Sequence, residues 1–372
     1  MSVLVESIEL RLVGIPMTRS LRTSTGVMEN SKTTVIVVLR TSEGLKGFGE
    51  SAAQGSPTYS EETSYTCYEV LRRHLCPRVL GRAVFSVGEF VDGYRDVRGN
   101  QFAKSGLEAA FWDVLSQQSG VGMKTLMGGT RHEVEVGEAI GICDSVDALL
   151  AEVDARLREG YKRVKLKIQP GWDLEPVRAV RGAFPECRLM VDANGAYHLS
   201  DSRVFARLDS LNLMMIEQPL GYADIVDHAA LQRQLATPIC LDESIRSLEG
   251  ARQALQIGAC GVINVKPGRV GGVLEAIRIH DLCMAWGVPA WVGGMMESGI
   301  GRASNICVAS LPAFSLPADM SPASMYFESD LVEPTFAVEE GIVQVPEGIG
   351  LGFEVAEARL QAYTLASTTV TE

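Results

Sequence analysis

Five charged residues recur along the middle of the chain at almost constant spacing. They are Lys167, Asp192, Glu217, Asp242 and Lys266, separated by 25, 25, 25 and 24 residues. A period of that length corresponds to one strand, one helix and two loops, as in the units of a parallel barrel. Each charged residue therefore takes the same place in successive units, at the carboxyl end of its strand, where barrel active sites are built.

The three acidic residues of this series each end an apolar run. The runs are LMVD, LMMIE and ICLD, which end at Asp192, Glu217 and Asp242. Three carboxylates brought together in a barrel repel one another unless a cation lies among them. Oxygen ligands without His or Cys favour Mg²⁺, with Mn²⁺ as the alternative. The competing interpretation is that each residue caps the following helix. Equal register in three units favours a metal site.

Two lysines lie in the strand that opens the series. In the run RVKLKI, Lys165 and Lys167 are two positions apart, so both side chains point to the same face of a strand. Two neighbouring ammonium groups are expected to lower one lysine pKa and so provide a general base. The alternative is an exposed edge strand with surface lysines, which the regular series disfavours.

Lys266, in the run VINVKPG, falls about half a ring of strands away from Lys167. A carbon acid held between the two lysines can lose its proton to one and regain it from the other on the opposite face, which is racemisation. With a single lysine as base, the same site supports a β-elimination while the other cation stabilises the enolate. These residues predict proton removal α to a substrate carboxylate.

The surrounding segments predict an α/β protein: a modified TIM barrel, (β/α)7β, with an α+β capping domain. Residues 1–130 contain β-branched runs and then helical periodicity, which predicts the cap. Residues 131–330 alternate Val/Ile-rich runs with amphipathic helices, and residues 331–372 are expected to pack back on the cap. The predicted barrel strands are EVGEAIG, RVKLKI, RLMVDAN, LMMIEQP, PICLDES, GVINVKP and PAWVGG, with an eighth near AFSLPAD.

Composition excludes several classes of partner. The 372 residues carry a net charge of −12, which argues against nucleic acid and anionic membranes and leaves small molecules. Hydrophobic residues make up 46% and charged residues 22%, the balance of a globular protein. Eight cysteines without a CxxC pair, an N-terminal run interrupted by charges and no apolar run of membrane-spanning length predict a cytoplasmic protein.

Longer strings around these residues resemble the enolase superfamily, in its muconate lactonizing enzyme subgroup, and most of all the o-succinylbenzoate synthase and N-succinylamino acid racemase family. The strings are GYKRVKLKIQPGWDLEPVRAVR, VDANGAY, IEQPL, TPICLDESI, INVKPGRVGG and GGMMESGIGRASN. Sites of this superfamily use Lys or His bases with Mg²⁺. The resemblance implies that Lys167 and Lys266 form the acid/base pair, and that Lys165 assists. It also makes the three strand-end carboxylates the Mg²⁺ ligands.

The resemblance also assigns residues around this centre. Arg269, in KPGR, matches a position that accompanies racemase activity, and Asn194, Glu243 and Ser298 would lie near the metal or the substrate. A barrel loop would lie against the substrate's acyl chain, and it consists of Gly294, Met295 and Met296. Cap loops near 18–30 and 51–60 would shape the pocket, and they include Arg22, Thr25 and Gln54. In these loops the chain departs from the family, with TSTG in place of TSFG.

By this resemblance the protein would be a Mg²⁺-dependent isomerase or lyase. It would racemise N-succinyl (N-acyl) amino acids, dehydrate a cyclohexadiene precursor to o-succinylbenzoate, or do both. A muconate-type cycloisomerase would use the same lysines and metal. A dipeptide epimerase would need a second acidic residue where Asp319-Met320-Ser321 has none. A catalytically silent ligand-binding barrel is the non-enzyme alternative, although no lysine or metal carboxylate is lost. Barrels of this family usually assemble, so a homo-oligomer is expected.

Overall fold

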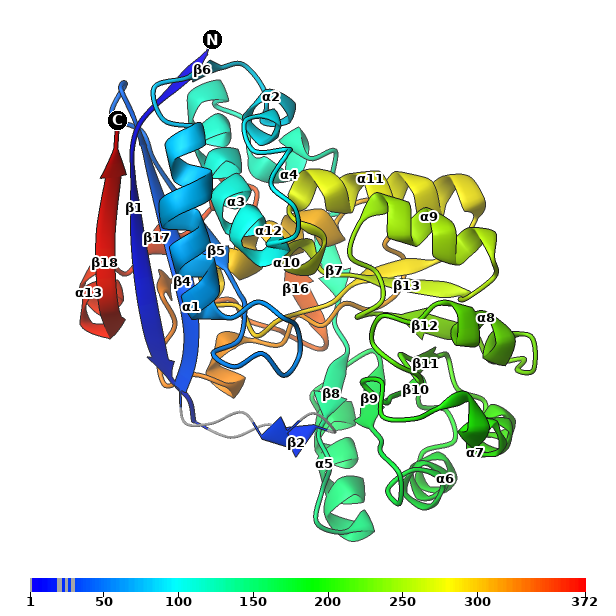
Figure 1. Ribbon diagram of the computed structural model, residues 1–372. Coiled ribbons are helices and arrows are strands. Elements are labelled where there is room, and N and C mark those ends of the chain that lie inside the picture. Colours follow the sequence, from blue (N-terminus) through cyan, green and yellow to red (C-terminus); the bar gives the residue numbers. More distant parts are fainter. Residues whose placement is uncertain (1, 19–21, 24–25, 28–30) are drawn as a thin grey trace.

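The computed structural model describes residues 2–18, 22–23, 26–27 and 31–372 (Figure 1). Of the predicted cap-loop residues, Thr25 lies outside these ranges. Arg22 is described only by its place in β2 (Arg22–Thr23), a two-residue strand that pairs with β3 (Gly26–Val27). The part that these two residues would play in a substrate pocket therefore stays a prediction.

An antiparallel sheet forms the centre of the capping region, in the order β18-β1-β4-β5, with β6 also paired to β1. The bounds are β1 (Val3–Pro16), β4 (Ser31–Thr41), β5 (Lys46–Ser51), β6 (Ala83–Val84) and β18 (Thr364–Thr371). β-Branched residues dominate β4 and fit its buried, pleated surface. The last strand of the chain pairs with the first one, from Ser7 opposite Thr371 onward. The domain boundaries after residues 130 and 330 stay predictions.

Helices pack on β4 and β5 (Figure 1). This region contains α1 (Ser64–Val70), η1 (Leu71–Leu75), η2 (Cys76–Arg78), α2 (Val87–Asp92), α3 (Gln101–Ser119) and α4 (Met123–Leu126). Helix α3 approaches β5 so closely that a Cβ at Gly49 would lie 2.1 Å from the carbonyl oxygen of Gly106. Only glycine permits this approach. The contact fixes β5, and with it the start of the cap loop that follows.

Seven parallel strands form the second sheet, in the order β14-β13-β12-β11-β10-β9-β8. They are β8 (Glu138–Ile140), β9 (Val164–Lys167), β10 (Leu189–Asp192), β11 (Ile216–Glu217), β12 (Ile239–Leu241), β13 (Val262–Val265) and β14 (Ala290–Val292). All seven lie within the predicted runs. Helices α5 to α9 and α11 follow the outside of the curled sheet (Figure 1).

The connecting elements after the strands have the following bounds. They are α5 (Val146–Arg158), α6 (Leu174–Ala183), η3 (Leu199–Asp201), α7 (Ser202–Leu208), η4 (Asp209–Leu211), α8 (Val226–Gln232), α9 (Leu248–Gln256), α10 (Pro267–Val270), α11 (Val273–Trp286), α12 (Gly299–Ala309) and η5 (Ala323–Met325). The remaining elements are β7 (Glu133–Glu135), β15 (Val332–Glu333), β16 (Ile342–Gln344), β17 (Glu354–Val355) and α13 (Glu357–Tyr363). Across the described ranges, no helix combines the length and apolar character that crossing a membrane requires.

The segment predicted as the eighth strand closes the ring. Phe314 bridges Ala290 of β14, and Ala318 bridges Val136 just before β8, both in parallel. These are isolated bridges rather than a strand, and Pro317 between them has no N–H to donate to a ladder. The (β/α)7β architecture is confirmed, and its eighth element is reduced to two bridges.

The barrel interior is packed below the strand ends. Met190, Met215, Cys240, Val262 and Trp291 form a separate buried cluster. Three of them lie two residues before a strand-end carboxylate, so period-two alternation puts them on the same inward face. These apolar side chains fill the barrel interior, so the polar side chains of the site lie at the carboxyl end of the barrel.

Glu108 joins the cap to the barrel and predicts a pH dependence of stability. It is buried in α3, where its Oε1 accepts hydrogen bonds from Trp112 Nε1 at 3.0 Å and from the Leu274 amide of α11 at 2.7 Å. Burial raises its pKa from 4.5 to about 7. Because the folded protein holds this proton at a higher pH than the unfolded chain, the stability it contributes is present below pH 4.5 and is lost as pH rises through about 7.

We therefore expect Glu108→Gln to become more stable relative to the parent as pH rises from about 5 to 8, by up to about 3 kcal/mol. Urea unfolding of both proteins at the two pH values measures this difference. The exposed Glu186→Gln serves as control and should track the parent. A gap between Glu108→Gln and the parent that does not change with pH would contradict the assignment.

Candidate active site

Five neighbouring strands carry the charged series at one edge of the sheet. Asp192 ends β10 and pairs in register with Lys167 at the end of β9 and with Glu217 at the end of β11. Asp242 directly follows β12, and Lys266 directly follows β13. Because these strands are parallel neighbours, their final residues meet at the same end of the barrel. The structure thus brings together the residues that the spacing predicted to lie together.

Lys165 and Lys167 point to the same face of β9. Lys165 Nζ donates to Glu217 Oε2 at 3.1 Å and to Asp319 Oδ2 at 2.6 Å. Lys167 Nζ donates to Asp192 Oδ2 at 2.6 Å. Both lysines are buried. The strand is therefore an inner strand with two buried ammonium groups, and the alternative of surface lysines on an exposed edge is wrong.

The expectation that neighbouring ammonium groups lower a lysine pKa is wrong for Lys165. Burial lowers its pKa, but Asp319 and the carboxylates at the ends of β11 and β10 outweigh burial and raise the pKa above its ordinary value. The pKa of Lys266 is also raised, because Asp242 and Tyr59 outweigh the effect of burial. The sequence argument counted the neighbouring cation, whereas the carboxylates that face these lysines decide the direction.

Lys266 and Arg269 hold Asp242 from two sides. Lys266 Nζ donates to Asp242 Oδ2 at 2.9 Å, and Arg269 Nη1 donates to Asp242 Oδ1. Burial raises the pKa of Asp242, but the two cations overcome it and hold the pKa below its usual range. Tyr59, from the cap, accepts hydrogen bonds from Lys266 Nζ at 2.9 Å and from Arg269 Nη1 at 3.1 Å. The cap therefore contacts the candidate catalytic lysine directly.

The three strand-end carboxylates fit a divalent cation by their chemistry. Burial, followed by the charge of Asp192, raises the pKa of Glu217 to about 7. A bound cation relieves such repulsion, and a set of carboxylate oxygens suits Mg²⁺ or Mn²⁺. Among the residues described, no three Asp, Glu, His or Cys side chains cluster with metal-holding spacing. Instead, ammonium and guanidinium groups bind these carboxylate oxygens.

Asn194 and Glu243 are hydrogen-bonded to each other beside Lys167. Asn194 Oδ1 accepts from Lys167 Nζ at 2.7 Å, and Asn194 Nδ2 donates to Glu243 Oε1 at 3.0 Å. Burial, together with the nearby charges of Asp242 and Asp192, raises the pKa of Glu243 to about 8. Glu243 Oε2 is buried without a hydrogen-bond partner among the described residues. Both side chains thus lie beside the strand-end carboxylates.

The loop after β14 leads from Lys266 toward the cap. A Cβ at Gly293 would lie 2.8 Å from Lys266 Cε, and a Cβ at Gly294 would lie 2.7 Å from the carbonyl oxygen of Asp319. Ser298, at the end of the loop, donates from its amide and its hydroxyl to Glu50 Oε2, at 3.0 and 2.6 Å. Between the contact of Gly293 with Lys266 and that of Ser298 with Glu50 lie the loop residues predicted to be near the substrate, Gly294, Met295 and Met296. Ser298 itself binds a carboxylate of the cap.

Gln54 lies in the cap loop after β5, and its carbonyl oxygen accepts a hydrogen bond from the Ser64 amide at 2.8 Å. Its side chain is half-buried. This contact ties the loop to the start of α1. A contact of Gln54 with the substrate stays a prediction.

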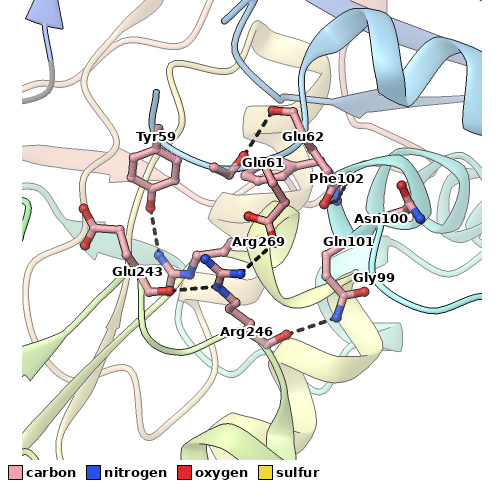
Figure 2. A pocket seen from close by; sticks show the side chains of 11 residues that line it. Tyr59, Glu61, Glu62, Gly99, Asn100, Gln101, Phe102, Glu243, Arg246 and Arg269 are labelled. Atoms are coloured by element: carbon pink, nitrogen blue, oxygen red, sulfur yellow. Dashed lines mark hydrogen bonds and ion pairs between the residues drawn. The ribbon is translucent and has the colours of Figure 1, made fainter. Parts of the chain in front are cut away.

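Cap and barrel meet around a small cavity of about 140 Å³ (Figure 2). It lies between the cap loop Tyr59–Glu62, the start of α3 and the barrel residues Glu243, Arg246 and Arg269. Arg246 Nη1 pairs with Glu61 Oε1 across the junction at 2.7 Å. Ligand pockets usually have roughly 300–1,000 Å³. The cavity is thus a gap along the junction of cap and barrel, at the edge of the site.

Three residues of the site were missed by sequence reasoning. Asn264 Nδ2 donates to Glu217 Oε1 at 2.7 Å, Asp319 pairs with Lys165, and Tyr59 contacts Lys266. Asn264 stands two positions before Lys266, the same alternation that paired the first two lysines, so this signal was available. Asp319 ends the predicted eighth strand, as the three carboxylates of the series end theirs, although it does not fall on the 25-residue spacing. Tyr59 carries no such signal, because its position depends on how the cap docks.

Comparison with known proteins agrees with this architecture. The chain matches the mandelate racemase / muconate lactonizing enzyme N-terminal domain over residues 7–128 and the enolase C-terminal domain-like family over residues 148–359. It is 44% identical to an o-succinylbenzoate synthase of Geobacillus kaustophilus, over 98% of this chain and 97% of that protein. It is 45% identical to an N-succinylamino acid racemase of Thermus thermophilus, over 97% of both chains.

A crystal structure of an enolase superfamily member from Listeria innocua has the same fold, with a TM-score of 0.96, 37% identity and 99% coverage of both chains. The similarity extends over the cap and the barrel together. The chain therefore belongs to the enolase superfamily, in the family that contains the o-succinylbenzoate synthases and N-succinylamino acid racemases.

Proposed function

We propose that the protein removes the proton α to a substrate carboxylate, and thereby racemises N-succinyl or other N-acyl amino acids, dehydrates a cyclohexadiene precursor to o-succinylbenzoate, or does both. One observation carries the proposal: Lys167 and Lys266 reach the same group of carboxylates from β9 and from the end of β13, with three strands between them. The names of the two relatives support the choice of substrates.

Asp192, Glu217 and Asp242 are the residues that would hold Mg²⁺, or Mn²⁺. Enzymes of this superfamily generally use Mg²⁺. When bound, such a cation neutralises the substrate carboxylate and stabilises the negative charge that develops as the α proton leaves. The fit rests on the oxygen-only donors and on their mutual repulsion, which, after burial, raises the pKa of Glu217 to about 7.

The chain's own residues then move the proton. In racemisation, the Cα–H bond breaks, its electron pair passes into the enolate, and the neutral Nζ of one lysine takes the proton. The ammonium of the other lysine gives a proton to the opposite face, which inverts the centre. Lys165, held between Glu217 and Asp319, supplies a fixed positive charge beside the developing enolate.

For dehydration, one lysine is enough as base. It takes the α proton, and the electron pair of the Cα–H bond passes into the enolate. The same lysine, now an ammonium, gives the proton to the hydroxyl on the neighbouring carbon, which leaves as water while the enolate electrons form the new double bond. The second lysine then serves as a cation that stabilises the enolate. Arg269 keeps Asp242 and Tyr59 in place beside Lys266 and so positions that lysine.

The proposal is tested by incubating the protein with Mg²⁺ in D₂O and a panel of single-enantiomer N-acylamino acids. We expect loss of the α-¹H signal and decay of optical rotation with N-succinyl substrates, and neither after heat inactivation. If no acyl amino acid exchanges its α proton while the cyclohexadiene precursor is turned over, the proposed racemase activity is excluded and the dehydration remains. Absence of both reactions would overturn the proposal.

The substrate is thus a small carboxylate, as is usual for the family. A homo-oligomeric assembly and a cytoplasmic location stay predictions. The position where a dipeptide epimerase would carry a second acidic residue is Ser321, whose hydroxyl donates to the buried Glu138. That side chain is already engaged, so it does not favour the epimerase alternative.

A further inference from the structure

Lys32 is a buried charged residue that the proposed chemistry does not use. It lies on β4 of the cap, and 1% of its surface is exposed. Its ammonium donates two hydrogen bonds to backbone carbonyls, to Ala52 at 3.2 Å and to Met295 at 3.0 Å. Ala52 belongs to the cap loop after β5, and Met295 belongs to the barrel loop after β14. One side chain therefore connects two loops from different parts of the fold.

The barrel loop reaches the site at its other end. A Cβ at Gly293 would lie 2.8 Å from Lys266 Cε and 2.3 Å from Asn264 Oδ1. A Cβ at Gly294 would lie 2.7 Å from the carbonyl oxygen of Asp319, whose side chain pairs with Lys165. The backbone at the start of the loop thus lies so close to Lys266 and Asn264 that a side chain there would collide with them, and any shift of this backbone changes the wall of the site beside Lys266.

The backbone of this loop has a conformation that must be held. Met296 has φ +57°, in the left-handed region that side chains other than glycine rarely adopt. Such a conformation persists when neighbouring contacts over-determine it. Those contacts are present on both sides: Met295 is bound at its carbonyl by Lys32 and at its amide by Glu297 Oε2, at 3.0 Å. Ser298 is bound by Glu50.

The charge of Lys32 interacts with two buried carboxylates, those of Glu50 and Glu297. Burial lowers the pKa of Lys32, and the carboxylates of Glu50 and Glu297 act against this effect. Glu50 also accepts from Thr34 Oγ1 at 3.0 Å, and Glu297 Oε1 accepts from Asn305 Nδ2 at 2.8 Å. A buried charge is retained only where it is paired and hydrogen-bonded. Lys32 is hydrogen-bonded to the two backbone carbonyls, and both carboxylates are themselves fixed to the loop or to the helix that follows it.

We propose that Lys32 is a positioning residue that sets the acyl-arm specificity of the site. From the cap, it holds the Met295–Met296 backbone in a single strained conformation, so that this loop presents one fixed wall to the substrate arm. The identity of the arm rests on the proposed function. The clamp itself does not, because it follows from the two carbonyl contacts and the backbone of Met296.

The test compares Lys32→Met, an unbranched side chain one atom shorter that has no N–H donors, with Lys46→Met. Lys46 lies on neighbouring β5, is only half-buried, and pairs with Glu357 at the surface. The first readout is hydrogen–deuterium exchange of the peptide that spans 293–298, measured without substrate. We expect about tenfold faster exchange in Lys32→Met and no change in Lys46→Met.

The second readout is kinetics with N-succinyl and N-acetyl forms of one amino acid. For Lys32→Met we expect KM for the N-succinyl substrate to rise about tenfold, with kcat within about twofold, and the preference between the two arms to fall about fivefold. A purely structural role would lower the thermal midpoint and leave this preference unchanged. If Lys32→Met does not fold, Lys32→Gln is measured against the same criteria, because its neutral side chain is one atom shorter and is not expected to reach both carbonyl oxygens.

Parent-like loop exchange in the Lys32 variant overturns the clamp. Faster loop exchange with unchanged arm preference overturns the role in specificity. If the parent protein turns over no acyl amino acid, the proposed function fails, while the exchange experiment still decides whether Lys32 holds the loop. The two failures are therefore distinguishable.

Discussion

Replacement of Lys167 by Ala is expected to stop racemisation while α-proton exchange of one enantiomer persists, and Lys266→Ala is expected to show the opposite enantiomer preference. Each lysine serves one face of the substrate, because the two Nζ groups approach from strands separated by three others. Loss of a positioned base slows proton transfer by about 10²- to 10⁴-fold. Proton NMR in D₂O, run on each enantiomer separately and combined with polarimetry, measures both effects.

Lys162→Ala is the matched control, since Lys162 is a half-buried lysine just before the same strand, β9. It should racemise at nearly the parent rate. The two-lysine mechanism is wrong if either active-site variant interconverts enantiomers at the parent rate. It is also wrong if both variants exchange the proton of the same enantiomer, because one base would then serve both.

The barrel was predictable because its signal is local and periodic. Each buried parallel strand is a short apolar run, and the charged residue that ends it recurs at the length of one strand-helix unit, from Lys167 to Lys266. Period-two alternation also placed Lys165 beside Lys167 correctly. The same rule applied to VINVK would have found Asn264, which binds Glu217. The sequence therefore contained the information needed to place Asn264 in the site.

Contacts made by docking were not predictable in this way. Tyr59 reaches Lys266 only because the cap packs on the barrel, and no spacing within either region encodes that approach. Lys32 crosses the same junction to Met295, 263 residues away. The expectation of a lowered lysine pKa was wrong for Lys165 for a related reason. The direction of the shift depends on Asp319, which arrives from the closing segment of the ring and outweighs burial only together with Glu217 and Asp192. The direction of such a pKa shift can be predicted only when all the segments that surround the site are in place.

Removal of divalent cations is expected to abolish activity, and added Mg²⁺ or Mn²⁺ is expected to restore it. The three carboxylates that we assign to the metal are buried and mutually repulsive, so the substrate carboxylate faces their negative charge unless a divalent cation lies between them. Dialysis against EDTA followed by metal titration, with α-proton exchange as the assay, measures this. Glu217→Gln should bind Mg²⁺ about 10²-fold more weakly or worse in calorimetry, because it loses a charged ligand.

The pH dependence of binding gives the sharper test. The pKa of Glu217 is about 7, so the side chain is increasingly protonated below that pH and the cation must displace the proton. Magnesium affinity should therefore fall as pH decreases from about 8 to 6, and this fall should be smaller in Glu217→Gln, which has no proton to displace at that position. The exposed Glu175→Gln should behave as the parent at every pH. Full activity after chelation, or parent-like Mg²⁺ binding by Glu217→Gln, would show that these carboxylates serve only as partners of the lysines.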